Sequence, residues 1–342
     1  MKATKLLEYK LKGERNISSK NPILDGDHLY CLFTYNKNYF ESRIICLTKN
    51  SFEVVWEYKY PFIMNNLIIH NKILFACTMD GVLLELDAIN GKLLSSNELN
   101  IDRCGRTSEI YNDLIAVGGI QGTKETTCFS LSDKKIKWTK ENNGHSSIPL
   151  IIQNSVLQCA EHQITCFDLD SGKQVWNSKE KRGYVRNPIY FKSSIVVGGK
   201  GHINFYNLKN GKLEGQYSEQ NMGSISRIIA HKDCLYFGDS IGNFYGTKIF
   251  EKKNVFGKIK YSAKKLWEYN SSGTIESLPV LNESKVLFIN DDNKLICLDR
   301  FTGELVWLFN TKAEAGVSGL VLDKENVFVS VAKGHVYKIK LN

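Results

Sequence analysis

Nine cysteines are the first residues in this sequence that could do chemistry, because thiolates bind metals, form disulfides and act as nucleophiles. They include no Cys-x-x-Cys pair and no two adjacent cysteines, and nine is an odd number. This pattern argues against a disulfide framework, a zinc ribbon or a vicinal disulfide. Four of them, Cys46, Cys128, Cys166 and Cys297, recur at one position of an internal repeat, which Gly246 also occupies. We therefore expect reduced, buried packing residues.

Aspartates and histidines offer acid–base and metal chemistry, but their positions favour structural roles. Asp87, Asp168 and Asp299 each end an expected strand just before a turn that contains glycine. There a carboxylate accepts backbone N–H bonds and stabilises the turn. The seven histidines show no His-x-His and no His-Glu-x-x-His spacing. The sequence therefore predicts no catalytic residue, no metal site and no cofactor.

A third group of candidates lies in the loops that lead into the innermost strand of each expected repeat unit. If these units form a propeller, the loops gather around one mouth of its central channel. Arginine and tyrosine are favoured in protein-binding patches and in carboxylate capture, whereas a hydrated rim without a ligand is the open alternative. The candidates for binding a partner or ligand here are Arg103, Arg106, His145, Arg182, Tyr184, Arg186, Arg227 and Glu276.

These residues are positioned by a repeated phrase of a strand, a tight turn and a second strand that ends in an aromatic residue. It is clearest in 295–307 and 164–176, with a related copy in 83–95, and the turns contain Thr-Gly, Ser-Gly and Asn-Gly. Such a phrase predicts a β-hairpin, and a further strand pair lies upstream of each one. Four short strands in each period of roughly 40 residues indicate the blades of a β-propeller.

Counting the hairpins gives seven complete blades and an incomplete eighth. The last three strands lack a fourth, and segment 6–10 resembles 55–59, so the N-terminal strand is expected to close the last blade. We predict a single all-β domain over 1–342, an eight-bladed β-propeller of four-stranded antiparallel blades. The expected blades are 20–60, 64–100, 105–141, 145–180, 183–219, 223–270, 273–311, and 315–342 together with 4–11.

The repeat resembles that of the pyrroloquinoline-quinone-like (quinoprotein) propeller family, whose pattern Gly-x-Leu-Tyr-Ala-Leu-Asp-x-x-Thr-Gly-Lys-x-x-Trp is followed closely by 295–307. The resemblance covers essentially the whole chain and implies an eight-bladed propeller of bacterial origin. It also implies that the recurring tryptophans dock neighbouring blades through a buried indole. These tryptophans are Trp56, Trp138, Trp176, Trp267 and Trp307.

The resemblance leaves activity open, because the family includes quinoprotein dehydrogenases and non-enzymatic scaffolds of membrane-protein assembly. It implies that an enzyme of this type would hold Ca²⁺ through Glu, Asn and Asp at the ring mouth and, in many members, carry a disulfide between adjacent cysteines. This chain has no adjacent cysteines and no long catalytic insertion. We therefore expect no quinoprotein dehydrogenase activity and no enzyme.

The net charge of +9 is concentrated in two segments. Residues 1–20 carry six Lys or Arg against two Glu, a net +4, and residues 251–265 carry six Lys against one Glu, a net +5. The second segment belongs to an insertion of blade six over 249–265. It fits both an amphipathic hairpin that binds an acidic surface and a solvated, extended hairpin. Its apolar residues are Phe250, Val255, Phe256, Ile259 and Tyr261, and its lysines are Lys252, Lys253, Lys258, Lys260, Lys264 and Lys265.

The first residues contain no apolar run of seven or more, and no window reaches eighteen apolar residues, so we expect neither a secretory signal nor a membrane-spanning helix. We expect a cytoplasmic protein that is a monomer by itself.

The leading hypothesis is a non-enzymatic scaffold that binds another protein through the mouth loops or the basic insertion, as an assembly factor or a toxin-neutralising protein. One alternative is a small-molecule or cofactor-binding propeller, including a cytoplasmic enzyme, with its ligand at the channel mouth. Another is electrostatic attachment to nucleic acid or anionic lipid. Specific nucleic-acid readout is not expected, because the lysine-rich insertion lacks arginine and aromatic stacking platforms.

Overall fold

The computed structural model describes residues 3–11, 17–37, 39–120, 123, 125–141, 147–180, 186–312 and 319–341. The side chains at positions 36, 37, 39, 40, 106, 186 and 226 are outside this description. The chain forms two compact units, residues 1–104, 280–299 and 305–342 in the first and residues 105–279 and 300–304 in the second.

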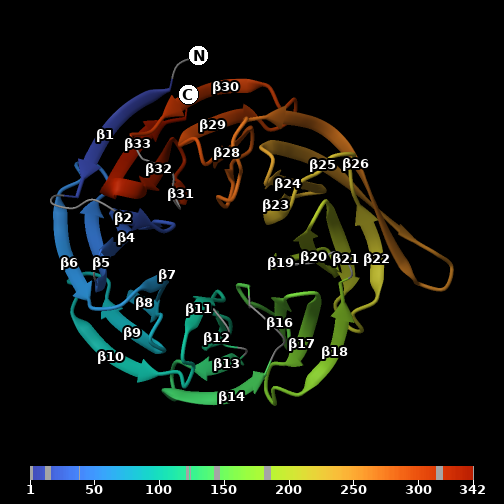
Figure 1. The fold of residues 1–342 in the computed structure, drawn as a ribbon, viewed down its shortest axis with the longest axis horizontal. Coiled ribbons are helices and arrows are strands. Elements are labelled where there is room, and N and C mark those ends of the chain that lie inside the picture. The colour runs from blue at the N-terminus through green and yellow to red at the C-terminus, as the bar shows by residue number, and fades with distance from the viewer. Residues whose placement is uncertain are drawn as a thin grey trace. The chain divides into compact units, whose positions relative to one another are not determined.

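The first unit contains the sheet that joins the two ends of the chain, where β1 (Thr4–Lys10) pairs antiparallel with β33 (His335–Lys340) (Figure 1). A short 3-10 helix, η1 (Ala332–Gly334), precedes β33. In hydrogen-bonded order, the sheets of this unit are β1, β33, β32 (Asn326–Val331) and β31 (Gly319–Leu322); β2 (Ile17–Ser19), β4 (His28–Lys37), β5 (Tyr39–Thr48) and β6 (Val54–Tyr60), with β3 (Ile23–Asp25) also on β4; β10 (Leu93–Glu98), β9 (Val82–Asp87), β8 (Ile73–Thr78) and β7 (Met64–His70); and β27 (Val280–Leu281), β28 (Lys285–Ile289), β29 (Lys294–Asp299) and β30 (Leu305–Asn310).

The second unit contains four sheets whose strands follow one another in chain order. They are β11 (Cys104–Thr107), β12 (Leu114–Gly119), β13 (Glu125–Ser130) and β14 (Lys135–Glu141); β15 (Leu150–Ile152), β16 (Ser155–Ala160), β17 (Gln163–Asp168) and β18 (Gln174–Lys179); β19 (Arg186–Phe191), β20 (Ser194–Gly199), β21 (His202–Asn207) and β22 (Leu213–Tyr217); and β23 (Ile225–His231), β24 (Cys234–Asp239), β25 (Asn243–Lys253) and β26 (Ile259–Asn270).

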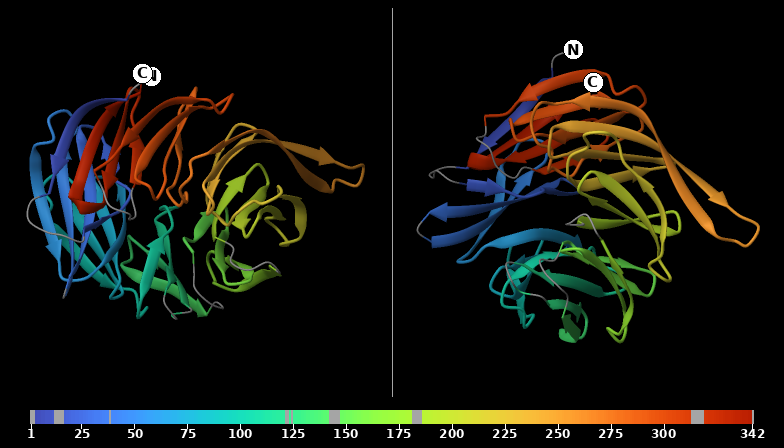
Figure 2. Two further views of the ribbon diagram at one scale, coloured as in Figure 1. Left: turned by 45° about the horizontal axis from the view of Figure 1, so that its top comes forward. Right: turned by 45° about the vertical axis from the view of Figure 1, so that its right-hand side comes forward.

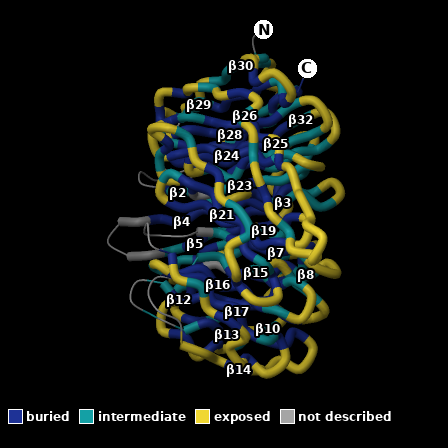
Figure 3. The backbone as a smooth tube through the Cα atoms, turned by 90° about the vertical axis from the view of Figure 1, so that its right-hand side faces the viewer, coloured by how far each residue is buried: buried dark blue, intermediate teal, exposed yellow. Residues whose placement is uncertain are grey.

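These sheets confirm the predicted fold class, an all-β, eight-bladed propeller of four-stranded antiparallel sheets in which the N-terminal strand completes the sheet of the C-terminal strands. The middle strands of the blades are the most buried, because both of their faces pack inside the protein. Strands such as β24 and β28 run through buried regions, whereas the turns between strands are exposed (Figure 3).

The predicted packing role of the cysteines and tryptophans is confirmed by the strand register. In five blades one small residue lies directly opposite the tryptophan on the neighbouring strand. Burial raises the pKa of Cys46 and Cys297 to about 12 and that of Cys128 and Cys166 to about 11, so these thiols stay protonated and unreactive. The pairs are Cys46–Trp56, Cys128–Trp138, Cys166–Trp176, Gly246–Trp267 and Cys297–Trp307.

Each of four tryptophans also docks on the next hairpin along the chain. Trp176 Nε1 donates to the backbone oxygen of Leu208 at 2.8 Å, and Trp56, Trp138 and Trp267 make the same bond at 2.8–3.0 Å. The turn glycine of that next hairpin lies against the indole face: a Cβ on Gly172, whose φ is +64°, would come within 2.6 Å of Trp138 Cδ2. The turn therefore needs glycine for its left-handed conformation and for the close approach.

Trp307 departs from this pattern. Within the described residues its buried Nε1 has no hydrogen-bond partner. The corresponding backbone oxygen, that of Leu341, is instead bonded by Lys285 Nζ. A lysine has thus replaced the indole at the acceptor that the repeat provides.

The repeat aspartates stabilise turns, as predicted, where the structure describes their bonds. Asp87 Oδ1 accepts from the backbone N–H groups of Ile89 and Asn90 at 2.7 and 3.1 Å. Asp168 Oδ1 accepts from the Ser171 backbone N–H and hydroxyl at 2.8 and 2.6 Å, which lowers the pKa of Asp168. These hydrogen bonds give the two carboxylates a structural role in the turns.

Candidate functional site

The residues predicted to line a channel mouth lie partly on strands rather than in loops. Arg106, Arg186 and Arg227 are on β11, β19 and β23, each the first strand of its sheet, and Arg227 is half-buried. Arg103 and Glu276 precede β11 and β27 and are exposed. The convergence of this group stays a prediction, because several of its members lie outside the described residues: His145, Arg182, Tyr184, and the side chains of Arg106 and Arg186.

A buried carboxylate, Asp239, connects the loops at one end of the β23–β26 sheet, the end where β24 turns into β25. Asp239, at the end of β24, has no exposed surface. Its Oδ1 accepts from the backbone N–H groups of Ile241 and Asn243 at 3.0 and 2.9 Å, while Oδ2 accepts from the Gly223 N–H at 2.9 Å. The Tyr245 hydroxyl donates to Oδ2 at 3.2 Å. One side chain thus ties the turn between β24 and β25 to the segment that enters β23.

Serine and threonine side chains extend this connection to the segment that follows β26. Ser240 Oγ accepts from the Ser224 N–H at 2.9 Å, and Thr274 Oγ1 donates to the Ser240 oxygen at 3.0 Å. Ser271 Oγ donates to the Gly242 oxygen at 3.0 Å. We call segments 223–224, 240–242 and 271–276 the loop edge; hydrogen bonds connect its three segments.

A second buried carboxylate lies at the corresponding end of the β15–β18 and β19–β22 sheets. Glu180 follows β18, and its Oε2 accepts from Asn204 Nδ2 at 2.5 Å and from the Tyr206 hydroxyl at 3.0 Å. His202 Nε2 lies 3.4 Å from the same oxygen, and His202 Nδ1 faces the Lys200 backbone oxygen at 3.0 Å. Burial raises the pKa of Tyr206, with the Glu180 charge adding to the effect. The cluster is sealed from solvent, so it positions strands and does not do chemistry.

Sequence reasoning missed both carboxylates. For Asp239 a signal existed, because Thr78 and Asn290 hold the same place between the second and third strands of their blades. Each accepts from the backbone N–H four residues later, in Val82 and Lys294. Glu180 carries no comparable repeat signal, since its partners come from another blade.

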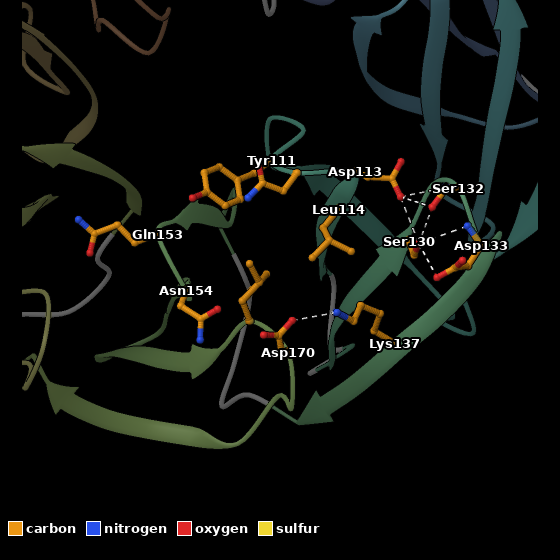
Figure 4. A pocket seen from close by; sticks show the side chains of 12 residues that line it. Tyr111, Asp113, Leu114, Ser130, Ser132, Asp133, Lys137, Gln153, Asn154 and Asp170 are labelled. Carbon is orange, nitrogen blue, oxygen red and sulfur yellow. Dashed lines mark hydrogen bonds and ion pairs between the residues drawn. The ribbon is translucent and has the colours of Figure 1, made fainter.

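The opposite end of the β11–β14 and β15–β18 sheets carries an open polar pocket of about 560 Å³ (Figure 4). Its charged groups are already paired within the protein: Asp113 Oδ2 accepts from the backbone N–H and hydroxyl of Ser132, and Lys137 donates to Asp170 at 3.0 Å. Partial burial alone would raise the pKa of Asp113, but these hydrogen bonds lower it. The lining is Tyr111, Asn112, Asp113, Leu114, Ser130, Ser132, Asp133, Lys137, Gln153, Asn154, Leu169 and Asp170.

The basic insertion is a long hairpin. The β25–β26 ladder runs from the Asn243–Asn270 pair to the Lys253–Ile259 pair, whereas β24 stops pairing at Lys248. The paired ends of β25 and β26 therefore extend past β24, as Figure 2 shows.

The base of this hairpin belongs to the core, which the sequence did not reveal. Tyr261, one of the apolar residues of the predicted insertion, is 5% exposed, and its ring stacks on Phe205 of β21 at 5.1 Å between centroids. Phe205 pairs with Gly215, at the position where five other blades have tryptophan, and a Cβ on Gly215 would collide with Tyr261. The hairpin thus supplies an aromatic ring to a blade that lacks its own tryptophan, while Ile259 is half-buried beside it.

The other face of the hairpin is exposed and basic. Lys252 lies directly opposite Lys260, and Lys248 opposite Lys264, with the 40% exposed Phe250 between the two pairs. Like charges in directly opposed positions destabilise a strand pair. Lys265 is different, since it forms ion pairs with Glu268 at 2.8 Å and Glu219 at 3.5 Å. No described residue forms an ion pair with the other predicted lysines, which are Lys252, Lys253, Lys258, Lys260 and Lys264.

The tip of the hairpin presents two apolar side chains on a rigid turn. Val255 is 95% and Phe256 91% exposed. Asn254 Oδ1 accepts from the N–H groups of Phe256 and Lys258 at 3.0 and 2.8 Å, and Gly257 adopts a φ of +76°. The sequence singled out these residues, but only the structure separates them from the buried Tyr261.

Within the described ranges, no group of three or more His, Cys, Asp or Glu side chains is placed to hold a metal ion. In the same part of the chain no helix is both long and apolar enough to cross a bilayer.

Two solved structures resemble this chain along nearly its whole length. The crystal structure of the computationally designed Ika8 protein superposes with a TM-score of 0.78 at 12% identity, covering 97% of this chain and 98% of that one. The crystal structure of BamB from Moraxella catarrhalis superposes with a TM-score of 0.71 at 15% identity, covering 99% and 100%. At these identities the likeness concerns the fold, which is that of the eight-bladed propeller class.

The family follows from the sequence match. Residues 79–230 and 161–342 match the family described as outer membrane protein assembly factor BamB, and the chain belongs to this family of PQQ-repeat propellers. The predicted resemblance to quinoprotein-like propellers is thereby confirmed. No curated protein sequence matches the chain.

Proposed function

We propose that this protein is a non-enzymatic scaffold of the assembly-factor type, which binds another protein at the loop edge. The observation that carries the proposal is membership of a family described as an assembly factor. The same description favours assembly over the neutralisation of a toxin.

The loop edge supports the proposal physically. Asp239, Ser240 and Ser271 hold three loop segments together before any partner arrives. Little conformational entropy is then lost on binding, which favours recognition by a rigid surface. Arg227, on β23 next to this edge, and Glu276, within it, give the edge charges of both signs.

A photocrosslinking amino acid placed at Arg227 or at Glu276 in the native cell tests this function. We expect one discrete protein adduct from both positions, and its loss in the charge-reversed variant Arg227→Glu when the crosslinker is at Glu276. Lys212 provides the control position, because it lies at the turn between β21 and β22, at the opposite end of its sheet. Adducts of equal yield from Lys212, or none from the loop edge, would contradict the proposal.

The small-molecule alternative has weaker support. The described pocket is polar, and its Asp113 and Lys137 already bond to neighbouring residues. Ligand binding must raise the melting temperature. A screen with pyrroloquinoline quinone plus Ca²⁺, sugars and carboxylates that raises it would favour this alternative. The cytoplasmic location and the monomeric state stay predictions.

A further inference from the structure

The two apolar residues at the end of the β25–β26 hairpin are the most exposed large hydrophobic side chains among the described residues. Val255 and Phe256 exceed 90% exposure, whereas Phe301 follows at 64%. They are adjacent and lie at the apex of a turn that Asn254 and Gly257 hold in shape. The fold gains no packing from them.

The lysines around this apex are likewise unused by the fold. Lys252 and Lys260 face each other on the exposed side of the hairpin, and Lys253 and Lys258 flank the turn. The nearest carboxylate on the hairpin, Glu251, lies on the other face and accepts from the Tyr261 hydroxyl at 3.3 Å. We call residues 252–260 the hairpin tip; it combines four lysines and three apolar residues with no acidic residue, and two of the apolar residues are exposed at its apex.

We propose that the hairpin tip docks on an anionic lipid surface, with Val255 and Phe256 entering the headgroup region and the lysines contacting lipid phosphates. A short apolar apex surrounded by cations is what an interfacial segment needs, since apolar burial and electrostatic attraction add. Long lysine side chains reach the phosphates while their stems lie along the apolar boundary. The phosphates also relieve the repulsion between the opposed lysines.

A protein partner fits the hairpin tip less well. A specific protein interface buries roughly 800 Å² on each side. A phenylalanine contributes about 150–250 Å² and a valine less, so the apex alone supplies less than half of that area. A lipid surface has no such requirement, because it is fluid and adapts to a projecting turn.

The geometry of the β23–β26 sheet permits both functions at once. The turn between β25 and β26 lies at one end of this antiparallel sheet, and the loop edge, with the β24–β25 turn, lies at the other. Lipid docking therefore does not occupy the surface proposed for the partner protein. The two proposals stand or fall separately.

Co-sedimentation with vesicles of equal parts phosphatidylcholine and phosphatidylglycerol tests the inference. We expect the protein to sediment with these vesicles and not with pure phosphatidylcholine, and binding to weaken as salt rises. V255S/F256S should lower the partition coefficient on the order of 30-fold, since two apolar side chains no longer leave water. K252Q/K260Q should lower it on the order of 20-fold.

The matched control is K179Q/K200Q, which removes the same charge from two exposed lysines of the same unit. Lys179 ends β18 and Lys200 lies between β20 and β21, so both are at the end of their sheets opposite the turns that correspond to the hairpin tip. It should change the partition coefficient by less than about twofold, because a charge distant from the lipid surface contributes little. V255S/F256S and the control should keep the wild-type unfolding temperature, because the replaced side chains pack against nothing. K252Q/K260Q should not lower it, because it removes the repulsion between opposed lysines. As a second measurement, F256W should shift its added fluorescence to the blue only with the anionic vesicles.

Several outcomes would overturn the proposal. These are no sedimentation of the wild-type protein with the anionic vesicles, an equal loss in the control variant, or binding unchanged by V255S/F256S. Tight binding to soluble polyglutamate that V255S/F256S leaves intact would assign the lysines to an acidic protein instead.

Discussion

The β17–β18 and β25–β26 hairpins hold the same place in their blades, and both carry a small residue opposite a tryptophan. In the first, the turn follows at once, and Gly172 packs on Trp138 of the preceding blade. In the second, the strands continue, and Tyr261 covers Gly215 instead. From Tyr261 towards the turn, the side chains on the hairpin's other face, such as Lys252 and Lys260, are exposed.

This difference separates the residues that hold neighbouring blades together from those that do not. At the β17–β18 turn, the Leu169 backbone oxygen bonds to the Trp138 indole, and Gly172 packs on its face, so the turn contributes to the contact between two blades. At the end of β25–β26, the base replaces a missing tryptophan, while the tip adds exposed apolar residues and opposed lysines that cost stability. Residues that the fold does not use are those most available for binding.

The largest effect is expected when the tryptophan contact between two blades is removed. Trp176→Ala should lower the free energy of unfolding by about 3–5 kcal/mol, because it leaves a cavity and removes the indole bond to Leu208. Phe256→Ala, the same kind of truncation at the hairpin tip, should change it by less than about 0.5 kcal/mol. Urea denaturation of both variants measures the difference. Equal losses would show that the tip packs on something after all.

A smaller effect compares two turn glycines with positive φ. Gly172→Ala should cost about 3 kcal/mol, since the added Cβ meets Trp138 at 2.6 Å in addition to the left-handed backbone. Gly257→Ala should cost only about 1 kcal/mol, because its Cβ would meet nothing closer than Lys253 Cε at 3.7 Å. Thermal unfolding followed by circular dichroism measures both. A larger loss for Gly257→Ala would contradict this ranking.

The smallest effect is expected from a comparison of lysines that form ion pairs with lysines of the hairpin tip. The ion-paired lysines are Lys5 and Lys312. In the sheet that joins the chain ends, Glu8 binds Lys5 at 2.6 Å and Lys312 at 3.1 Å. Partial burial would raise the pKa of Glu8, but these two lysines lower it to about 2. Its stabilisation is therefore complete above pH 4.5 and is lost as the pH falls towards about 2.

The nearby His335 acts in the same direction. Burial lowers its pKa below 6.5 despite the contact with Glu8, so acid disfavours the folded state here too. Glu8→Gln should flatten the fall of stability between pH 4.5 and 2, by less than about 1 kcal/mol because exposed ion pairs are screened. K252Q/K260Q should leave that fall unchanged. An unaltered curve in Glu8→Gln would refute the assignment.

Much of the fold could be predicted because it repeats locally. The cysteine position and the tryptophan docking follow from patterns within roughly one repeat of about 40 residues. The closing role of the N-terminal strand joins the two ends of the chain, but it could be predicted because the last repeat lacks its fourth strand. The exceptions are side chains whose partners are distant. Lys285 bonds to the Leu341 oxygen, 56 residues away, and no repeat pattern predicts that it takes the acceptor of an indole.

The residues of the basic insertion could be predicted from the sequence, but which of them are buried and which are exposed could not. The sequence by itself determined that lysines and apolar residues gather in one insertion, and how many blades the chain can form, because both are properties of residue order. Only the tertiary structure decided that Tyr261 enters the core while Phe256 stays in water. The physical reason is that burial depends on what a neighbouring blade lacks, in this case a tryptophan at Gly215.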